Sequence, residues 1–175
     1  MKILTKCIVC FLVIATQSAA SETNWPRWRG PGNNGTINSG NYPVTWAPEK
    51  VLWKIDVGGK GFSTPVVWDK RLYLTTGIKD RDTVLAFDWS GKQIWQKQLG
   101  TESAGNHTNG SGSNPSAVTD VSAVFVFFKS GNFAAFELDG AIRWKKNLFE
   151  LYGKDNSFFS FGTSPVLTKK YVVIA

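Results

Sequence analysis

The stretch that decides the fold occurs twice, as AFDWSGKQIW at residues 86–95 and as AFELDGAIRW at residues 135–144. In both copies an acidic residue follows the first alanine by two positions, a glycine by five and a tryptophan by nine. Each copy predicts a strand, a tight turn that contains the glycine, and a returning strand that carries the tryptophan. Self-similarity at a period of 20–50 residues is typical of propellers and other repeat arrays.

Two further markers follow the same period. Three prolines, each followed by a short apolar segment, lie 50 residues apart, at Pro65, Pro115 and Pro165. A tryptophan series steps by 42 and then 49 residues, through Trp53, Trp95 and Trp144. Because the proline spacing is fixed and the tryptophan spacing varies, we expect the insertions in the loops between the outer strand of one repeat and the proline of the next.

Four short strands are predicted in the first repeat, at residues 65–68, 71–76, 83–88 and 92–99. Residues 71–76 are rich in β-branched and aromatic residues, and the polar alternation of residues 92–99 suits an outer strand. The second repeat has the same order, and its residues 123–128 (AVFVFF) are apolar at every position, which suits a strand buried on both faces. The segments between these strands leave no room for a helix with an apolar stripe. We therefore predict an all-β fold, a β-propeller of four-stranded antiparallel blades, with a β-sandwich as the alternative.

The Ala-x-Asp-x-x-Gly-Lys-x-x-Trp pattern resembles the repeat of the pyrroloquinoline-quinone-like (PQQ-like) β-propeller family. That family includes quinoprotein dehydrogenases and the lipoprotein of the outer-membrane β-barrel assembly machinery. Residues 24–31 (NWPRWRGP), 61–67 (GFSTPVV) and 161–167 (FGTSPVL) resemble a secreted bacterial branch that does not look enzymatic. The resemblance implies that the tryptophan of each outer strand docks between blades, a structural role assigned here to Trp53, Trp95 and Trp144.

Family rings close with about seven or eight blades, so a chain of 175 residues is expected to be an N-terminal fragment holding part of a ring. An orphan strand ahead of the first blade is expected to close the ring, as it does in the family. The expected segments are a signal peptide (1–20), an N-terminal arm (21–50), the closing strand (51–57), blade 1 (63–99), blade 2 (113–146) and the start of blade 3 (163–175).

The N-terminus predicts export. A basic start, Met1–Lys6, precedes the nine apolar residues 7–15, and small residues at 18–20 suggest cleavage after Ala20. The apolar run is too short to span a bilayer. Both cysteines, Cys7 and Cys10, fall inside the segment to be removed, so we expect a mature chain without disulfides or thiolate metal sites, in the periplasm or outside the cell.

The formal net charge of +7 comes from basic residues scattered along the sequence. A nucleic-acid interface needs basic residues clustered on one face. We therefore expect no nucleic-acid partner, and no membrane span in the mature chain.

Two groups of residues are candidates for ligand binding. His107 and Asn109 lie in a polar loop ahead of the second blade, where the secreted branch has a similar stretch. Trp28 and Arg29 belong to an arm that alternates aromatic and cationic residues, which suits cation–π stacking or a carbohydrate platform. One histidine without nearby carboxylates is not a metal site, and no motif supplies catalytic residues.

We therefore predict an exported, non-catalytic binding or scaffolding propeller of the cell envelope, with protein or polysaccharide partners. A PQQ-dependent dehydrogenase is the first alternative, and a polysaccharide-binding module is the second. The resemblance makes PQQ a possible cofactor, but family enzymes hold it with calcium ligands, often under a disulfide of adjacent cysteines. Such a cysteine pair is missing from the sequence.

Overall fold

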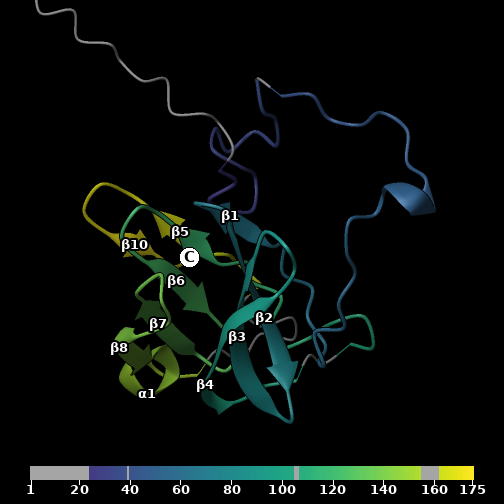
Figure 1. Cartoon of the computed structure of the whole chain (residues 1–175). Coiled ribbons are helices and arrows are strands. Elements are labelled where there is room, and N and C mark those ends of the chain that lie inside the picture. The colour runs from purple at the N-terminus through teal and green to yellow at the C-terminus, as the bar shows by residue number, and fades with distance from the viewer. Residues whose placement is uncertain (1–23, 39, 105–106, 155–161) are drawn as a thin grey trace, which may run out of the picture.

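The computed structural model describes residues 24–38, 40–104, 107–154 and 162–175. These residues form two four-stranded antiparallel sheets and one two-stranded sheet (Figure 1). The all-β prediction and the division into four-stranded blades are confirmed. Together the sheets form part of a propeller rather than a closed ring.

Blade 1 follows the chain order β1-β2-β3-β4. Its strands are β1 (Val66–Trp68), β2 (Arg71–Ile78), β3 (Arg81–Asp88) and β4 (Gln93–Thr101). Residues 82–87 of β3 are all buried, whereas β4 buries only Trp95 and Leu99 and exposes most of its other residues, as the outer strand of a blade does.

Blade 2 has the same topology, β5-β6-β7-β8. Its strands are β5 (Val118–Thr119), β6 (Val124–Phe127), β7 (Asn132–Phe136) and β8 (Ile142–Asn147). Its third strand, β7, is buried at every position. The sheet packs directly against blade 1, and Val124, Val126 and Phe136 are buried in the core that the two blades share.

Both blades have the same irregularity in the pairing of their third and fourth strands. Ala86 pairs with Trp95 and Ala135 with Trp144, and in both blades the register shifts immediately after the alanine. The shift inserts one extra residue into the outer strand, which is a β-bulge. Both turn glycines adopt positive φ, +84° at Gly91 and +91° at Gly140, a conformation that glycine accepts without steric penalty.

The remaining elements are short. Strands β9 (Val166–Leu167) and β10 (Val172–Val173) pair as an antiparallel hairpin. A 3₁₀ turn (η1, Pro48–Lys50) and a helix (α1, Leu148–Tyr152) bury none of their residues. Asn147 caps α1 by accepting hydrogen bonds from the backbone of Phe149 and Glu150. Neither helical segment of the described chain has the length or apolar character needed to cross a bilayer.

The main core lies between the two blades. Tyr73, Val84 and Ala86 of blade 1 meet Val124, Val126 and Phe136 of blade 2 in one buried cluster. Trp95 sits in the middle, with its ring centroid 5.8 Å from that of Tyr73 and 5.7 Å from that of Phe136. Such aromatic contacts stabilise a core beyond the area they bury.

The structure differs from the expectation at residues 51–57, which form no strand. A strand needs a neighbour for its ladder, and no described strand exchanges backbone hydrogen bonds with this segment. It belongs to the long excursion that Figure 1 shows around η1. Apolar side chains on that excursion are exposed, among them Val44, Trp46 and Leu52. Its ring-closing role stays a prediction.

Candidate functional site: a cleft at the inner strands

The inner ends of the three sheets converge and are tied together by serine hydroxyls. Strand β1 contacts β5, and β5 contacts β9. The Ser116 hydroxyl accepts a hydrogen bond of 2.8 Å from the backbone N–H of Thr64, and the Ser164 hydroxyl accepts one of 2.9 Å from the N–H of Ser116. All three residues adjoin a repeat proline. Proline itself has no N–H to donate. The hydrogen bonds between the sheets are therefore made by the residues next to the prolines, with backbone N–H donors and serine hydroxyl acceptors.

The N-terminal arm crosses the free inner edges of β1 and β5. Trp25 forms a two-way backbone bridge with Val67 of β1, and the Pro26 carbonyl accepts from the N–H of Thr119 in β5. The Trp25 ring also covers Gly30, where a Cβ would come within 2.9 Å of it. The arm therefore folds back as a tight unit at the innermost strands.

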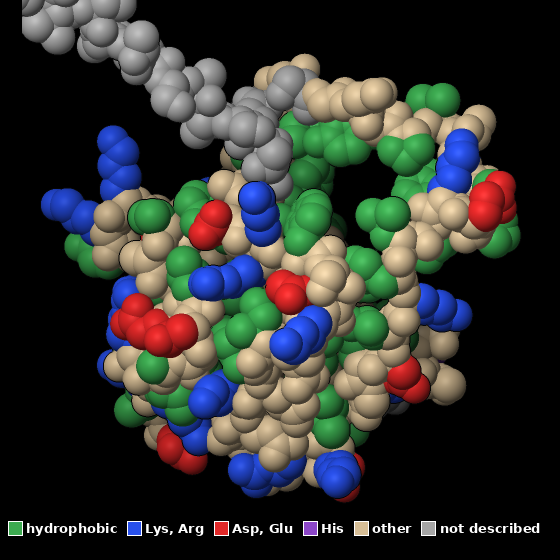
Figure 2. Space-filling model, in the orientation of Figure 1, with side chains coloured by type: hydrophobic (Ala, Val, Ile, Leu, Met, Phe, Trp, Pro, Cys, Tyr) green, Lys and Arg blue, Asp and Glu red, His purple; other side chains and the backbone are tan. Residues whose placement is uncertain are grey.

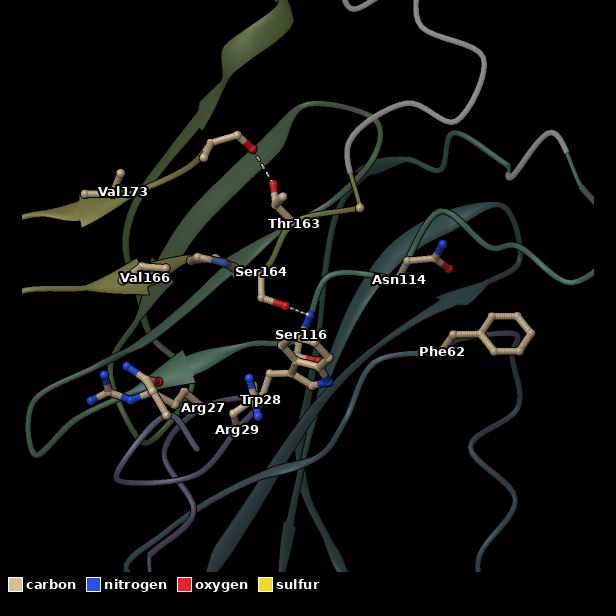
Figure 3. A pocket seen from close by; sticks show the side chains of 14 residues that line it. Arg27, Trp28, Arg29, Phe62, Asn114, Ser116, Thr163, Ser164, Val166 and Val173 are labelled. Atoms are coloured by element: carbon tan, nitrogen blue, oxygen red, sulfur yellow. Dashed lines mark hydrogen bonds between the residues drawn. The ribbon is translucent and has the colours of Figure 1, made fainter. Parts of the chain in front are cut away.

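A cleft of about 670 Å³ opens between this arm and the inner ends of the sheets. Figure 3 shows Arg27, Trp28 and Arg29 on one side of it, facing Ser164, Val166 and Val173. Asn114 and Phe62 lie at the other end. The cleft thus combines two guanidinium groups, two aromatic rings and several hydroxyl and amide groups.

The groups on the arm are available for binding. The Trp28 side chain is 60% exposed. Arg27 Nε is buried and has no hydrogen-bond partner among the described residues. Arg29 Nη2 donates to the Asn34 carbonyl at 3.3 Å, a long and exposed contact. Arg29 is exposed and therefore retains donors for an incoming acceptor, whereas Arg27 can offer only its Nη groups because its Nε is buried.

The structure separates the two candidate groups of the sequence. Trp28 and Arg29 line the cleft, whereas His107 and Asn109 do not. His107 is exposed, and its Nδ1 accepts from the backbone N–H of Asn109 at 3.1 Å, which orders the loop locally. The nearby residues 105–106 lie outside the described chain, as does the signal segment.

Several residues of the cleft were missed at the level of sequence: Phe62, Asn114, Ser116, Thr163 and Ser164. They share one signal, since each lies within three residues of a repeat proline. Their positions therefore follow the 50-residue proline period of the sequence. Only the convergence of the three sheets shows that they line one cleft.

Two of the three predicted blade-docking tryptophans make equivalent contacts, and the third does not. Trp53 Nε1 donates to the Trp89 carbonyl at 3.0 Å, and Trp95 Nε1 donates to the Leu138 carbonyl at 3.1 Å. These carbonyls stand at the same position of the repeated hairpin. Trp144 instead packs edge-on against Phe133 of its own blade, at 4.9 Å between centroids.

The model of a PQQ-like repeat family, described as outer membrane protein assembly factor BamB, matches residues 37–174. The chain belongs to this family. No curated protein matches it.

Two solved propeller structures share the fold of this PQQ-like chain. BamB from Moraxella catarrhalis is 13% identical with a TM-score of 0.50, over 71% of this chain and 33% of that one. A europium-containing methanol dehydrogenase is 15% identical with a TM-score of 0.52, over 71% and 22%. At such identities the likeness shows the fold alone. The chain spans a third or less of the length of these structures.

The cleft of this PQQ-like chain does not fit a calcium-bound quinone. Calcium takes oxygen ligands, with carboxylates prominent among them. The described lining offers amide and hydroxyl oxygens but no carboxylate, and two guanidinium groups that repel a cation. The described residues also contain no cluster of three or more histidine, cysteine, aspartate or glutamate side chains suited to a metal.

A second polar group lies between the blades, around Asp82 of β3. Its Oδ2 accepts from the Ser130 hydroxyl and, at 2.7 Å, from Asn132 Nδ2 of blade 2. Its Oδ1 is buried without a partner among the described residues. Burial raises the pKa of Asp82 to about 6, Glu102 adds to the rise, and the donors from Ser130 and Asn132 oppose it. This carboxylate joins two blades and does not reach the cleft.

Proposed function

We propose that this PQQ-like chain belongs to an exported binding or scaffolding protein of the cell envelope, which uses the cleft at its inner strands and carries out no catalysis. One observation carries the proposal. The arm places Arg27, Trp28 and Arg29 on one wall of a large cleft, beside hydroxyl and amide groups. Aromatic and guanidinium groups are the side chains most often found at binding hot spots.

The family supports the same function. Its model is described by an envelope assembly factor, and a BamB structure shares the fold. Protein or polysaccharide partners in the periplasm or outside the cell suit such a propeller. Residues 1–20 have the pattern of a cleavable leader, and the Lys and Arg side chains on the face in Figure 2 are scattered rather than gathered into a nucleic-acid footprint.

A PQQ-dependent dehydrogenase is the competing function, favoured by the methanol dehydrogenase among the fold relatives. It makes a distinct biochemical prediction. Addition of PQQ and calcium would then produce dye reduction with alcohols or sugars, which a binding protein does not show.

The test compares partner capture with enzymatic activity. Tagged full chain is cross-linked in cells of the producing organism, and bound protein and carbohydrate are identified by mass spectrometry and monosaccharide analysis. We expect one partner to be retained by the wild type and by Lys92→Gln, which alters an exposed residue of the β3–β4 turn, but lost with Trp28→Ala. Dye reduction that depends on PQQ and calcium would overturn the proposal.

A further inference from the structure

We propose that the cleft binds an acidic polysaccharide, with Arg27 and Arg29 pairing with its anionic groups and Trp28 stacking on a sugar ring. This inference rests on the proposed binding function and names the class of ligand. Three features of the cleft carry it: its charge, its aromatic wall and its hydrogen-bonding floor.

The charged side chains that line the cleft are both positive. Arg27 and Arg29 line it, and none of its described lining residues is an aspartate or a glutamate. Lys60 adds a third cation nearby, because its Nζ lies 5.8 Å from the centre of the Phe62 ring at the edge of the cleft. A planar guanidinium pairs with carboxylate or sulfate oxygens through two parallel N–H donors. An anionic ligand is therefore favoured over a neutral or cationic one.

The aromatic wall distinguishes a sugar from a simple anion. Trp28 is 60% exposed although it belongs to a tightly folded arm. Its own carbonyl accepts from Trp25 Nε1 at 3.4 Å, and the Trp25–Val67 bridge anchors the arm to β1. A large apolar ring held in solvent by ordered backbone offers a flat platform, and an amphipathic sugar face suits such a platform.

The floor of the cleft supplies neutral polar groups. Ser116 and Ser164 are already linked to each other and fixed in place, and Asn114 accepts from the backbone and hydroxyl of Ser111 through its Oδ1. Its side-chain NH₂ remains available as a donor. Hydroxyl and amide groups at fixed positions match the hydroxyls of a sugar chain. The volume of the cleft, about 670 Å³, is large enough to hold sugar residues and exceeds what a single ion needs.

Binding of three polymers to the purified full chain tests the inference: alginate for carboxylate groups, dextran sulfate for sulfate groups and dextran as the neutral control. Affinity electrophoresis and calorimetry measure the dissociation constants. We expect at least one polyanion to bind, with dextran binding at least ten-fold more weakly. The polyanion that binds more tightly identifies the anionic group. Equal binding of dextran would overturn the inference.

Two variants separate a built site from diffuse attraction to a basic protein. Arg29→Gln and Lys92→Gln each remove one positive charge from an exposed position, but only Arg29 lines the cleft. We expect Arg29→Gln to weaken polyanion binding by roughly ten-fold or more, as loss of a charged hydrogen bond does, and Lys92→Gln to leave it within about two-fold. Trp28→Ala should weaken it comparably without changing the charge. Equal losses for Arg29→Gln and Lys92→Gln would overturn the inference.

The outcomes also separate this inference from the proposed function. If the polyanions fail to bind but a protein partner is still captured in a Trp28-dependent manner, the glycan ligand is excluded and the binding function stands. If dye reduction depends on PQQ and calcium, the binding function itself falls. Circular dichroism of every variant verifies that the blades remain folded.

Discussion

The indole of Trp95 in blade 1 covers Gly140, the turn glycine of blade 2. A Cβ at Gly140 would lie 2.8 Å from Cδ2 of that ring, closer than real Cβ contacts allow. One repeat upstream, Trp53 covers Gly91 in the same way, with a Cβ distance of 2.7 Å. The glycine of the repeated hairpin therefore has two roles, because it permits a positive φ and leaves room for the tryptophan of the neighbouring repeat.

Substitution of this glycine separates the two roles. Gly140 and Gly58 both have a positive φ, +91° and +70°, but a Cβ at Gly58 would meet nothing within 4 Å. Gly58→Ala should therefore show only the backbone strain, about 1–2 kcal/mol. Gly140→Ala should lose a further ~1–3 kcal/mol because the indole must move. Urea unfolding of both variants measures the difference, and equal losses would contradict the role of the indole contact.

Removal of the indole itself should be among the most damaging single changes. Trp95 is only 8% exposed and sits between Tyr73 and Phe136. We expect Trp95→Ala to reduce the free energy of unfolding by about 3–5 kcal/mol through the cavity it leaves. Trp46→Ala is the control, since that ring is 79% exposed, and should change stability by no more than about 0.5 kcal/mol. Similar effects of the two changes would refute the assignment.

Two neighbouring buried threonines of β2 should respond oppositely to valine. Thr75 Oγ1 donates across the blades to the Pro115 carbonyl at 3.0 Å, whereas Thr76 Oγ1 is buried without a partner among the described residues. Thr75→Val leaves the buried Pro115 carbonyl without this donor and should destabilise the protein by about 1–3 kcal/mol. Thr76→Val removes an unsatisfied hydroxyl, so its stability should be unchanged or higher. A thermal or urea series on the pair measures this, and destabilisation by Thr76→Val would contradict it.

Asp82 predicts a pH dependence of defined sign. Its pKa is raised to about 6 in the folded protein from an ordinary value of 3.8. Between these values the folded state holds the proton that the unfolded state has released, so stability falls as pH rises through this range. Asp82→Asn removes the titration, and the stability of the variant relative to wild type should increase from about pH 4 to about pH 6, by something on the order of 3 kcal/mol.

Ser130 provides an internal check on that titration. Its hydroxyl donates to the Asp82 carboxylate and opposes the rise of the pKa of Asp82. Ser130→Ala should therefore extend the fall in stability to higher pH. Unfolding curves collected across the range measure both variants, and identical pH profiles for wild type and Asp82→Asn would show that the carboxylate does not control this dependence.

Much of the fold could be predicted from the sequence because its determinants are local. Strand β3 was expected at 83–88 and spans Arg81–Asp88, and β4 was expected at 92–99 and spans Gln93–Thr101. Alternation, β-branched residues and turn glycines act within a few positions of one another. Residues 51–57 form no strand in the described chain for the opposite reason. A strand exists only with a partner, and pairing is a long-range property.

The cleft could be predicted only in part. Trp28 and Arg29 stood out because aromatic and cationic residues alternate around them, but the polar loop ahead of the second blade also singled out His107, which does not line the cleft. Ser116, Ser164 and Phe62 come from three repeats and carry no individual signal. They lie in one cleft because the fold places β5 in contact with both β1 and β9, which their position near a proline does not reveal.

The repeated hairpin by itself therefore determined the class of fold, the strand order of each blade and the positions of the turn glycines, because backbone preference and apolar periodicity are written in adjacent residues. The tertiary structure alone decided that the indole of Trp95 rests on Gly140, that Asp82 is buried against Ser130, and that the arm faces Ser164 across a cleft. These contacts join residues tens of positions apart, and their geometry depends on how one sheet packs against the next.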